Sequence, residues 1–280
     1  MSRRRSADKP AKQRDVFVAR PFAGRADETE WVALREIVPA ATAPLRLRSS
    51  DVPVTLSTVL PLQWPGMVTR SGRRFLGLQV ASRSGDASRD LAAVLDQLLD
   101  AEPGSSVVPT GLPGPGPRLQ DLLDDAPIEV TVQSGFDYWL DGEEDPGGDT
   151  AEALERANAS VVPTERLTSV TSAYWCRMKE RSHLRWVLPE DEDPLLDALA
   201  RLSVAGGLAL GEGTRFVGTF RAYGVLVPVW DLPRETEAPS LEEPATAFRA
   251  RLDEALTGGA LTSDERRARA GLLNRQLTLR

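Results

Sequence analysis

The chain has 280 residues, of which 41% are hydrophobic, and a formal net charge of −7. This length and apolar content can build one large domain or two ordinary ones. A single cysteine excludes an internal disulfide framework and a multi-cysteine zinc site, and no apolar run approaches the ~20 residues of a membrane-spanning helix. We therefore expect a folded cytoplasmic protein that makes no membrane contact.

Residues 1–20 are predicted to form a disordered basic tail. The first fourteen residues carry six basic side chains against the carboxylate of Asp8, namely Arg3, Arg4, Arg5, Lys9, Lys12 and Arg14. This stretch has a net charge of +5, which leaves −12 on the rest of the chain. An acidic body argues against a broad nucleic-acid surface, whereas a short basic arm can bind phosphates weakly or simply keep the chain soluble. Weak nucleic-acid association through the arm is one hypothesis.

Residues 21–102 are predicted to form the first of two α+β halves. Apolar residues recur at helical spacing from Trp31 to Val38, behind an acidic capping segment that begins at Asp27. Pro39 ends this helix, because proline cannot donate a backbone hydrogen bond. The half therefore begins with a short helix.

Two strands and a second helix complete this half. Residues 52–60 and 74–82 are typical of strands, and the connection between them is too long for a tight hairpin. Ser88 is the predicted N-cap of an amphipathic helix. Five apolar residues share one face of that helix, namely Leu91, Val94, Leu95, Leu98 and Leu99. We expect this face to cover the strands.

Segment 103–117 is rich in proline and glycine and is the predicted linker between the halves. Residues 118–280 then form the second half. Its early strands are expected at 128–132, 170–178 and 183–188. A helix follows, with Asp193 as its N-cap and Pro194 at its first position.

The strongest strand signal lies at 214–232. Period-two alternation is predicted to place four small or aromatic residues on one face, namely Phe216, Gly218, Phe220 and Ala222. Gly224 is the expected turn between two strands, since it tolerates a positive φ. Pro228 lacks an N–H, so the second strand is predicted to lie at a sheet edge or to carry a bulge.

The C-terminus has the pattern of an αα-hairpin. Pro244 opens one helix and Gly258 ends it, and the capping box of Thr262 and Glu265 starts another. The predicted fold class is therefore α+β. Two β-rich halves carry amphipathic helices on mostly antiparallel sheets, with an αα-hairpin at the C-terminus.

Motifs for common chemistry are missing from the sequence. No lysine lies in a P-loop, and the glycines at 206–213 precede a strand instead of following one, as a dinucleotide site requires. The acidic loop 141–149 lacks the residue order of a calcium-binding EF-hand. We therefore predict no cofactor and no metal.

Cys176 and His183 are the residues to weigh as a nucleophile and its base. A four-residue loop, 179–182, would place them diagonally across a hairpin with Cβ atoms ~7 Å apart. A cysteine in such an apolar strand is more often packed in the core than reactive. Strand alternation also predicts that Cys176 is exposed if Trp175 and Trp186 are buried, and buried if they are exposed.

The same hairpin carries a candidate binding surface of four residues, namely Trp175, Arg177, Arg185 and Trp186. Aromatic rings and guanidinium groups can form a stacking surface for a partner. Direct pairing of the two tryptophans would equally give ordinary cross-strand packing. Both interpretations stay open.

Several stretches resemble an uncharacterised actinobacterial family, a domain of unknown function. They are ARPFAG, EWVALREIVPAATAPLRL, RRFLGLQVASRSGDASRDLA and GTFRAYGVLVPVWDLP. The resemblance covers nearly the whole chain and implies no activity. Because no convergent catalytic set is present, the sequence favours a non-catalytic binding or adaptor protein with an unknown protein partner. The alternatives are weak nucleic-acid association through the arm and a thiol-dependent enzyme using Cys176 and His183.

Overall fold

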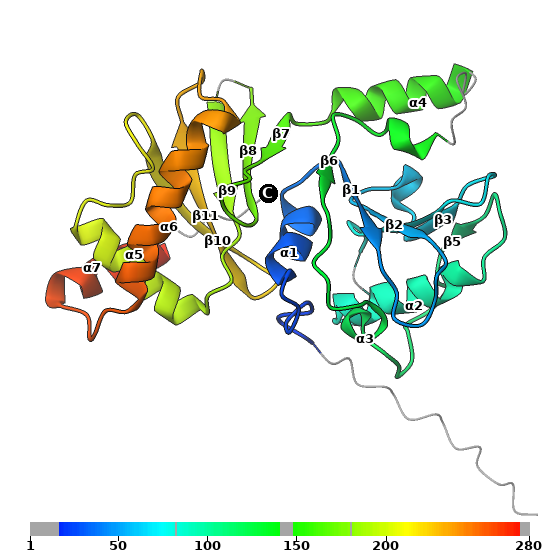
Figure 1. The fold of residues 1–280 in the computed structure, drawn as a ribbon, viewed down its shortest axis with the longest axis horizontal. Coiled ribbons are helices and arrows are strands. Elements are labelled where there is room, and N and C mark those ends of the chain that lie inside the picture. Colours follow the sequence, from blue (N-terminus) through cyan, green and yellow to red (C-terminus); the bar gives the residue numbers. More distant parts are fainter. Residues whose placement is uncertain (1–16, 82, 141–147, 180, 275–280) are drawn as a thin grey trace, which may run out of the picture.

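The structure is a computed structural model that describes residues 17–81, 83–140, 148–179 and 181–274. Two β-sheets lie on either side of one helix, α1 (Figure 1). The helices are α1 (Glu28–Glu36), α2 (Ala87–Leu99), α3 (Leu119–Leu122), α4 (Gly148–Ala159), α5 (Glu192–Val204), α6 (Glu242–Leu256) and α7 (Ser263–Asn274), with short 3-10 turns η1 (Pro61–Gln63), η2 (Asp137–Trp139) and η3 (Ala238–Leu241). The predicted α+β class is confirmed.

The first sheet has the strand order β5-β3-β4-β2-β1-β6. Its strands are β1 (Ala41–Leu45), β2 (Val54–Ser57), β3 (Gly66–Val68), β4 (Arg74–Gly77), β5 (Ser106–Val107) and β6 (Thr131–Val132). Neighbours β2 and β4 run parallel, while the other pairs are antiparallel. Parallel neighbours need a crossover connection, and this one passes through η1 and β3.

Helix α2 covers the first sheet with the predicted apolar face. Leu91, Val94, Leu95 and Leu98 are buried in one cluster with sheet residues. The predicted cap is wrong by two residues. The Asp86 carboxylate caps the helix, because it accepts the N–H groups of Ser88 and Arg89. Ser88 instead accepts the N–H of Leu119 at 2.9 Å and so ties α2 to α3.

The second sheet is antiparallel throughout, in the order β10-β11-β9-β8-β7. Its strands are β7 (Thr164–Arg166), β8 (Ala173–Met178), β9 (Arg181–Trp186), β10 (Arg215–Ala222) and β11 (Val225–Leu232). Helices α5, α6 and α7 cover its outer face, where Trp186, Trp230 and Phe248 pack together.

The 214–232 stretch forms the predicted hairpin, but two details differ. A register shift between Phe216 and Gly218 places Phe216 against the helices and Phe220 toward α1. Strand β11 lies inside the sheet instead of at its edge. Pro228 is tolerated there because pairing of β11 with β9 begins at Val229, just beyond the missing N–H.

The C-terminal helix pair is confirmed, and its capping box forms as predicted. Thr262 N donates to the Glu265 carboxylate at 2.7 Å, and Glu265 N donates to Thr262 Oγ1 at 3.3 Å. Helix α5 starts two residues earlier than predicted, with Asp191 in the N-cap position in place of Asp193. Asp191 uses its carboxylate for Arg20 instead.

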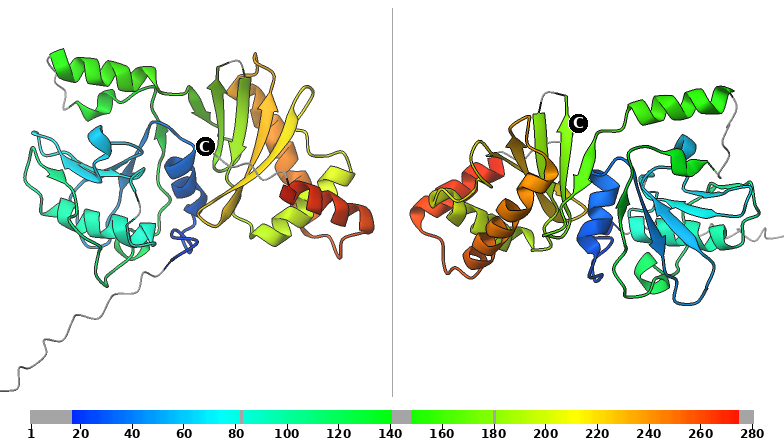
Figure 2. Two further views of the ribbon diagram at one scale, coloured as in Figure 1. Left: turned by 180° about the vertical axis from the view of Figure 1, so that it is seen from behind. Right: turned by 45° about the horizontal axis from the view of Figure 1, so that its top comes forward.

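Helix α1 is buried on all sides between the two sheets (Figures 1 and 2). One apolar cluster contains Trp31 and Leu34 of α1, Leu76 of the first sheet, and Tyr174 and Val227 of the second. Because this cluster is continuous, the two halves share a core.

Buried ionic contacts fix α1 against the second sheet. The Glu30 carboxylate, 4% exposed as a side chain, accepts Arg166 at 2.7 Å, Ser172 N at 3.2 Å and the Tyr174 hydroxyl. Burial raises the pKa of Tyr174 well above its usual value, with the adjacent Glu30 carboxylate adding to the rise. The phenol therefore stays a hydrogen-bond donor at neutral pH.

The end of the predicted tail takes part in this arrangement. Arg20 donates to Glu28 at 2.8 Å and to Asp191 at 2.6 Å, so it bridges α1 and the start of α5. At Gly224, with φ of +79°, an added Cβ would lie 2.2 Å from Arg20 Cγ. The turn glycine is therefore required by conformation and by space. Residues 1–16 lie outside the described residues.

The proline- and glycine-rich segment 103–117 does not separate the two sheets. It contains β5, which pairs with β3, and the later strand β6 still belongs to the first sheet. The chain passes from one sheet to the other between β6 and β7. Composition does not indicate that β5 and β6 belong to the first sheet, because a strand of two residues has no recognisable sequence pattern.

Candidate functional site

The two tryptophans of the predicted binding surface are core residues. Trp175 and Trp186 are each 2% exposed and lie on the helix-covered face of the second sheet. Their indole N–H groups donate at 2.9 Å to the carbonyls of Thr236 and Thr171. The two rings do not pair directly, because Trp175 lies opposite Leu184 and Trp186 opposite Ala173.

The two arginines of that surface lie apart. Arg177 stacks over Trp175, with its guanidinium 4.8 Å from the ring centroid, and pairs with Glu237 at 2.6 Å. Arg185 lies opposite Tyr174, on the other face of the sheet, and contacts the Met178 sulfur at 2.9 Å. The four residues therefore form no common surface.

Cys176, His183 and Asp231 lie directly opposite one another on three adjacent strands. The turn is two residues shorter than predicted, which replaces the expected diagonal with a direct pair. His183 Nδ1 lies 3.1 Å from the Asp231 carboxylate. Burial lowers the pKa of His183, although Asp231 opposes this shift.

Cys176 is 2% exposed, as are Trp175 and Trp186, so the prediction that either the cysteine or the tryptophans are exposed is wrong. The tryptophans on one face of the sheet and Cys176 on the other are all buried, because both faces are covered here. Burial raises the pKa of the thiol, and nearby Arg185 offsets this only in part. A thiol in this setting is a poor nucleophile at neutral pH.

Alkylation of the folded protein tests this assignment. We expect Cys176 to react with iodoacetamide roughly 100-fold more slowly in the native state than after denaturation, because a buried thiol reacts only through local opening. The contrast should persist from pH 5 to pH 9, since the raised pKa keeps the thiolate fraction below that of a free cysteine. Fast native labelling at low pH would restore the enzyme hypothesis.

Other predicted sites fall partly outside the described residues. All six residues of the basic arm precede residue 17, and most of the acidic loop lies within 141–147. Among the residues that the structure describes, no cluster of His, Cys, Asp or Glu could hold a metal ion. Within the same part of the chain, no helix is long and apolar enough to cross a membrane.

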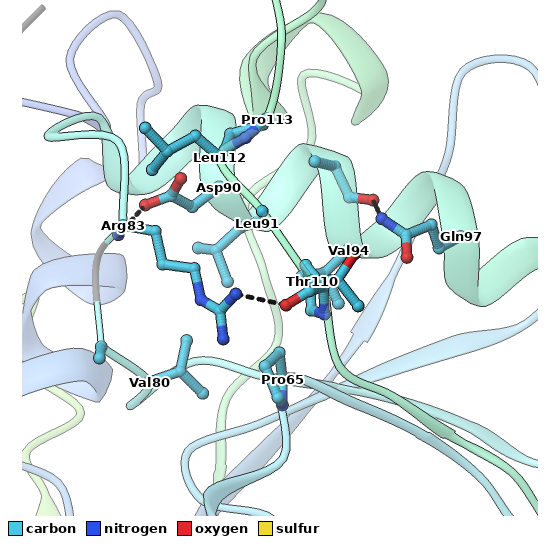
Figure 3. Close-up of a pocket in the computed structure, with 14 residues that line it drawn as sticks. Pro65, Val80, Arg83, Asp90, Leu91, Val94, Gln97, Thr110, Leu112 and Pro113 are labelled. Carbon is cyan, nitrogen blue, oxygen red and sulfur yellow. Dashed lines mark hydrogen bonds between the residues drawn. The ribbon is translucent and has the colours of Figure 1, made fainter. Parts of the chain in front are cut away.

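A cavity of about 310 Å³ lies between α2 and residues 109–113 (Figure 3). Its lining combines apolar and polar side chains, including Pro65, Val80, Arg83, Leu91, Val94 and Leu112. This volume lies at the lower end of the range for ligand pockets, roughly 300–1,000 Å³. We call it the α2 pocket.

Arginine side chains hold the outer wall of the α2 pocket in place. Arg83 Nη1 donates to the carbonyl of Pro109, and Arg89 donates to the carbonyls of Gly114 at 2.9 Å and Pro117 at 3.2 Å. Prolines in this segment cannot donate, so its carbonyls need such external partners. The wall is fixed by α2 and the loop before it.

The α2 pocket is not among the sites predicted from the sequence. Its walls come from three segments that are distant in the sequence, around Pro65, around Val80 to Val94, and at 109–113. The third segment lies within the predicted linker, 103–117. Arg83 is the sequence feature that could have indicated this pocket, because it is a cation just before an amphipathic helix and its acidic cap.

Comparison with known proteins supports the resemblance seen in the sequence. A model described as a family of unknown function, DUF5926, matches residues 21–280. Comparisons with curated proteins and with solved structures gave no match. An actinobacterial origin stays a prediction. The match spans nearly the whole chain, so this protein belongs to the DUF5926 family of unknown function.

Proposed function

We propose that this is a non-catalytic cytoplasmic protein that binds a small ligand in the α2 pocket. The observation that carries the proposal is a cavity of ligand size with apolar walls and a few convergent polar groups. Leu91 and Val94 give it a buried floor, and Leu112, 52% exposed, leaves apolar surface at its rim. A ligand seated there would remove this apolar surface from water.

The alternatives have less support. The thiol of Cys176 is buried with a raised pKa, so it lacks the access and ionisation that a catalytic cysteine needs. Nucleic-acid association through the basic arm stays a prediction, because those residues lie outside the described part of the chain. An adaptor role also stays a prediction, since no described feature identifies a protein partner.

Filling the cavity tests the proposal. Ala93 lies half-buried on the cavity wall, and Ala93→Trp would place an indole in the space that a ligand occupies. The probes are four six-carbon compounds: hexanoate, monohexyl phosphate, hexan-1-ol and hexylamine. We expect at least one to bind the full chain in ligand-observed NMR titrations, and the substitution to weaken that binding about tenfold or more.

Ala153→Trp is the matched control, because Ala153 is exposed on α4, outside the α2 pocket. It should leave binding unchanged. Thermal melting of both variants shows whether each one folds, since overpacking costs roughly 1–3 kcal/mol. Equal binding by wild type and a folded Ala93→Trp protein would contradict the α2 pocket as the site.

A further inference from the structure

The geometry points to a small organic anion as the ligand of the α2 pocket, an inference that rests on the function proposed above. The anionic head, a carboxylate or a phosphate, would bind Arg83, and a short apolar body would lie against Leu91 and Val94. Three observations lead to this class of ligand. The Arg83 guanidinium has no carboxylate partner among the described residues, the Asp90 carboxylate already accepts backbone N–H groups, and the other walls of the pocket are apolar.

The charge of Arg83 has no carboxylate partner among the described residues. Its guanidinium makes one hydrogen bond, to the neutral carbonyl of Pro109. Figure 3 shows the group between Val80, Pro65 and Thr110, at the cavity. A carbonyl leaves the positive charge uncompensated, and a guanidinium binds carboxylates and phosphates through paired N–H donors.

Arg118, which pairs with the cap of helix α2, offers a contrast. It pairs with the helix-capping carboxylate of Asp86 at 2.9 Å, so its charge is already compensated. The wider depression between β6 and β7 gives the same contrast, because its Arg166 is paired with Glu30. Arg83 is thus the pocket arginine whose charge is open to a ligand, within the part of the chain that is described.

Asp90 is the carboxylate that lines the pocket, and backbone amides already engage it. Its oxygens accept Arg83 N at 2.7 Å and Ser84 N at 3.2 Å. These bonds fix the loop that carries Arg83 and leave Asp90 less able to recruit a cation. The Asp90 carboxylate is thus directed at the backbone of the loop, whereas the guanidinium of Arg83 extends to the cavity (Figure 3), which favours an anion at that end over an amine.

The other side chains that line the α2 pocket favour a ligand with a hydrocarbon chain. Pro65, Val80, Leu91 and Val94 present hydrocarbon to the cavity, next to the exposed side chain of Leu112. A fully polar anion such as inorganic phosphate would leave these surfaces in contact with water. Head and body together define the class: an anionic group on a short hydrocarbon.

The six-carbon series tests this class because its members share one hydrocarbon and differ in the head. We expect hexanoate or monohexyl phosphate to bind the full chain about tenfold more tightly than hexan-1-ol, and hexylamine to bind most weakly. Added salt should reduce the advantage of the anions, since Arg83 is exposed. Preference for one anion identifies the head group.

Substitution of Arg83 is the second part of the experiment. Arg83→Gln should weaken anion binding about five- to tenfold more than it weakens binding of hexan-1-ol, because loss of the Pro109 contact affects both ligands and loss of the charge affects only the anions. Arg83→Lys should restore part of the loss, because it keeps the charge without the planar fork. Arg156→Gln is the matched control, since Arg156 is also exposed and donates to one backbone carbonyl, that of Glu152.

The outcomes separate the two proposals. If hexan-1-ol binds as tightly as both anions and Ala93→Trp blocks it, the pocket stands and the anionic class is overturned. Anion binding that survives Arg83→Gln also overturns the class. If none of the four compounds binds at about 1 mM, a level that weak fragments reach, both proposals fail.

Discussion

Replacing Trp31 with alanine is expected to lower the free energy of unfolding by about 3–5 kcal/mol. The indole is fully buried in α1 and stacks on Phe22, with ring centroids 5.6 Å apart. Its removal leaves a cavity in the apolar cluster that both sheets share. Because that cluster is continuous, urea unfolding should remain a single transition, with both sheets losing hydrogen-exchange protection together.

Trp31→Phe is the matched control. The buried Trp31 indole N–H has no hydrogen-bond partner among the described residues, so phenylalanine removes no hydrogen bond to them. We expect a loss of only about 1–2 kcal/mol, from the smaller ring alone. Two separate unfolding transitions in the Trp31→Ala protein would contradict a shared core.

Replacing Glu30 with alanine is expected to cost about 3 kcal/mol. The substitution removes the acceptor for Arg166, Ser172 N and the Tyr174 hydroxyl. Unpaired groups are then left at the contact between α1 and the second sheet. The value falls at the low end for a buried pair because the Arg166 side chain is 35% exposed and water can screen it.

Glu165→Ala is the control for this prediction, since Glu165 is an exposed carboxylate on the same strand as Arg166. Its effect should stay within about 0.5 kcal/mol. A double-mutant cycle with Arg166→Ala isolates the pairwise energy of Glu30 and Arg166. A coupling indistinguishable from zero would mean that the ion pair adds nothing to the contact.

The sequence predicted those parts of the fold that local physics determines. Helix α2 was found because Leu91, Val94 and Leu95 recur at the helical period, and α7 because its capping box is complete within four residues. The β10–β11 hairpin was found because Gly224 sits between two apolar strands. Each signal lies within one segment, so it needs no knowledge of distant contacts.

The missed features depend on contacts between distant segments. No local sequence pattern indicates that β2 pairs in parallel with β4, or that β11 lies inside its sheet. The predicted register of the hairpin around Cys176 is wrong because its turn is two residues shorter than expected. The α2 pocket was missed because Arg83 meets Pro109 only after folding.

The burial of α1 also sets an order of events during synthesis. The helix ends at Glu36, whereas the last strand of the second sheet, which supplies Val227 to the shared cluster, begins at Val225, roughly 190 residues later. At about 5–20 residues per second, a ribosome needs roughly 10–40 seconds to make that interval. Throughout this time the second sheet that packs against α1 is incomplete, so part of the shared apolar cluster lacks its partners. We therefore expect the N-terminal half to expose apolar surface of the kind that chaperones bind, until residues made near the end of translation complete its core.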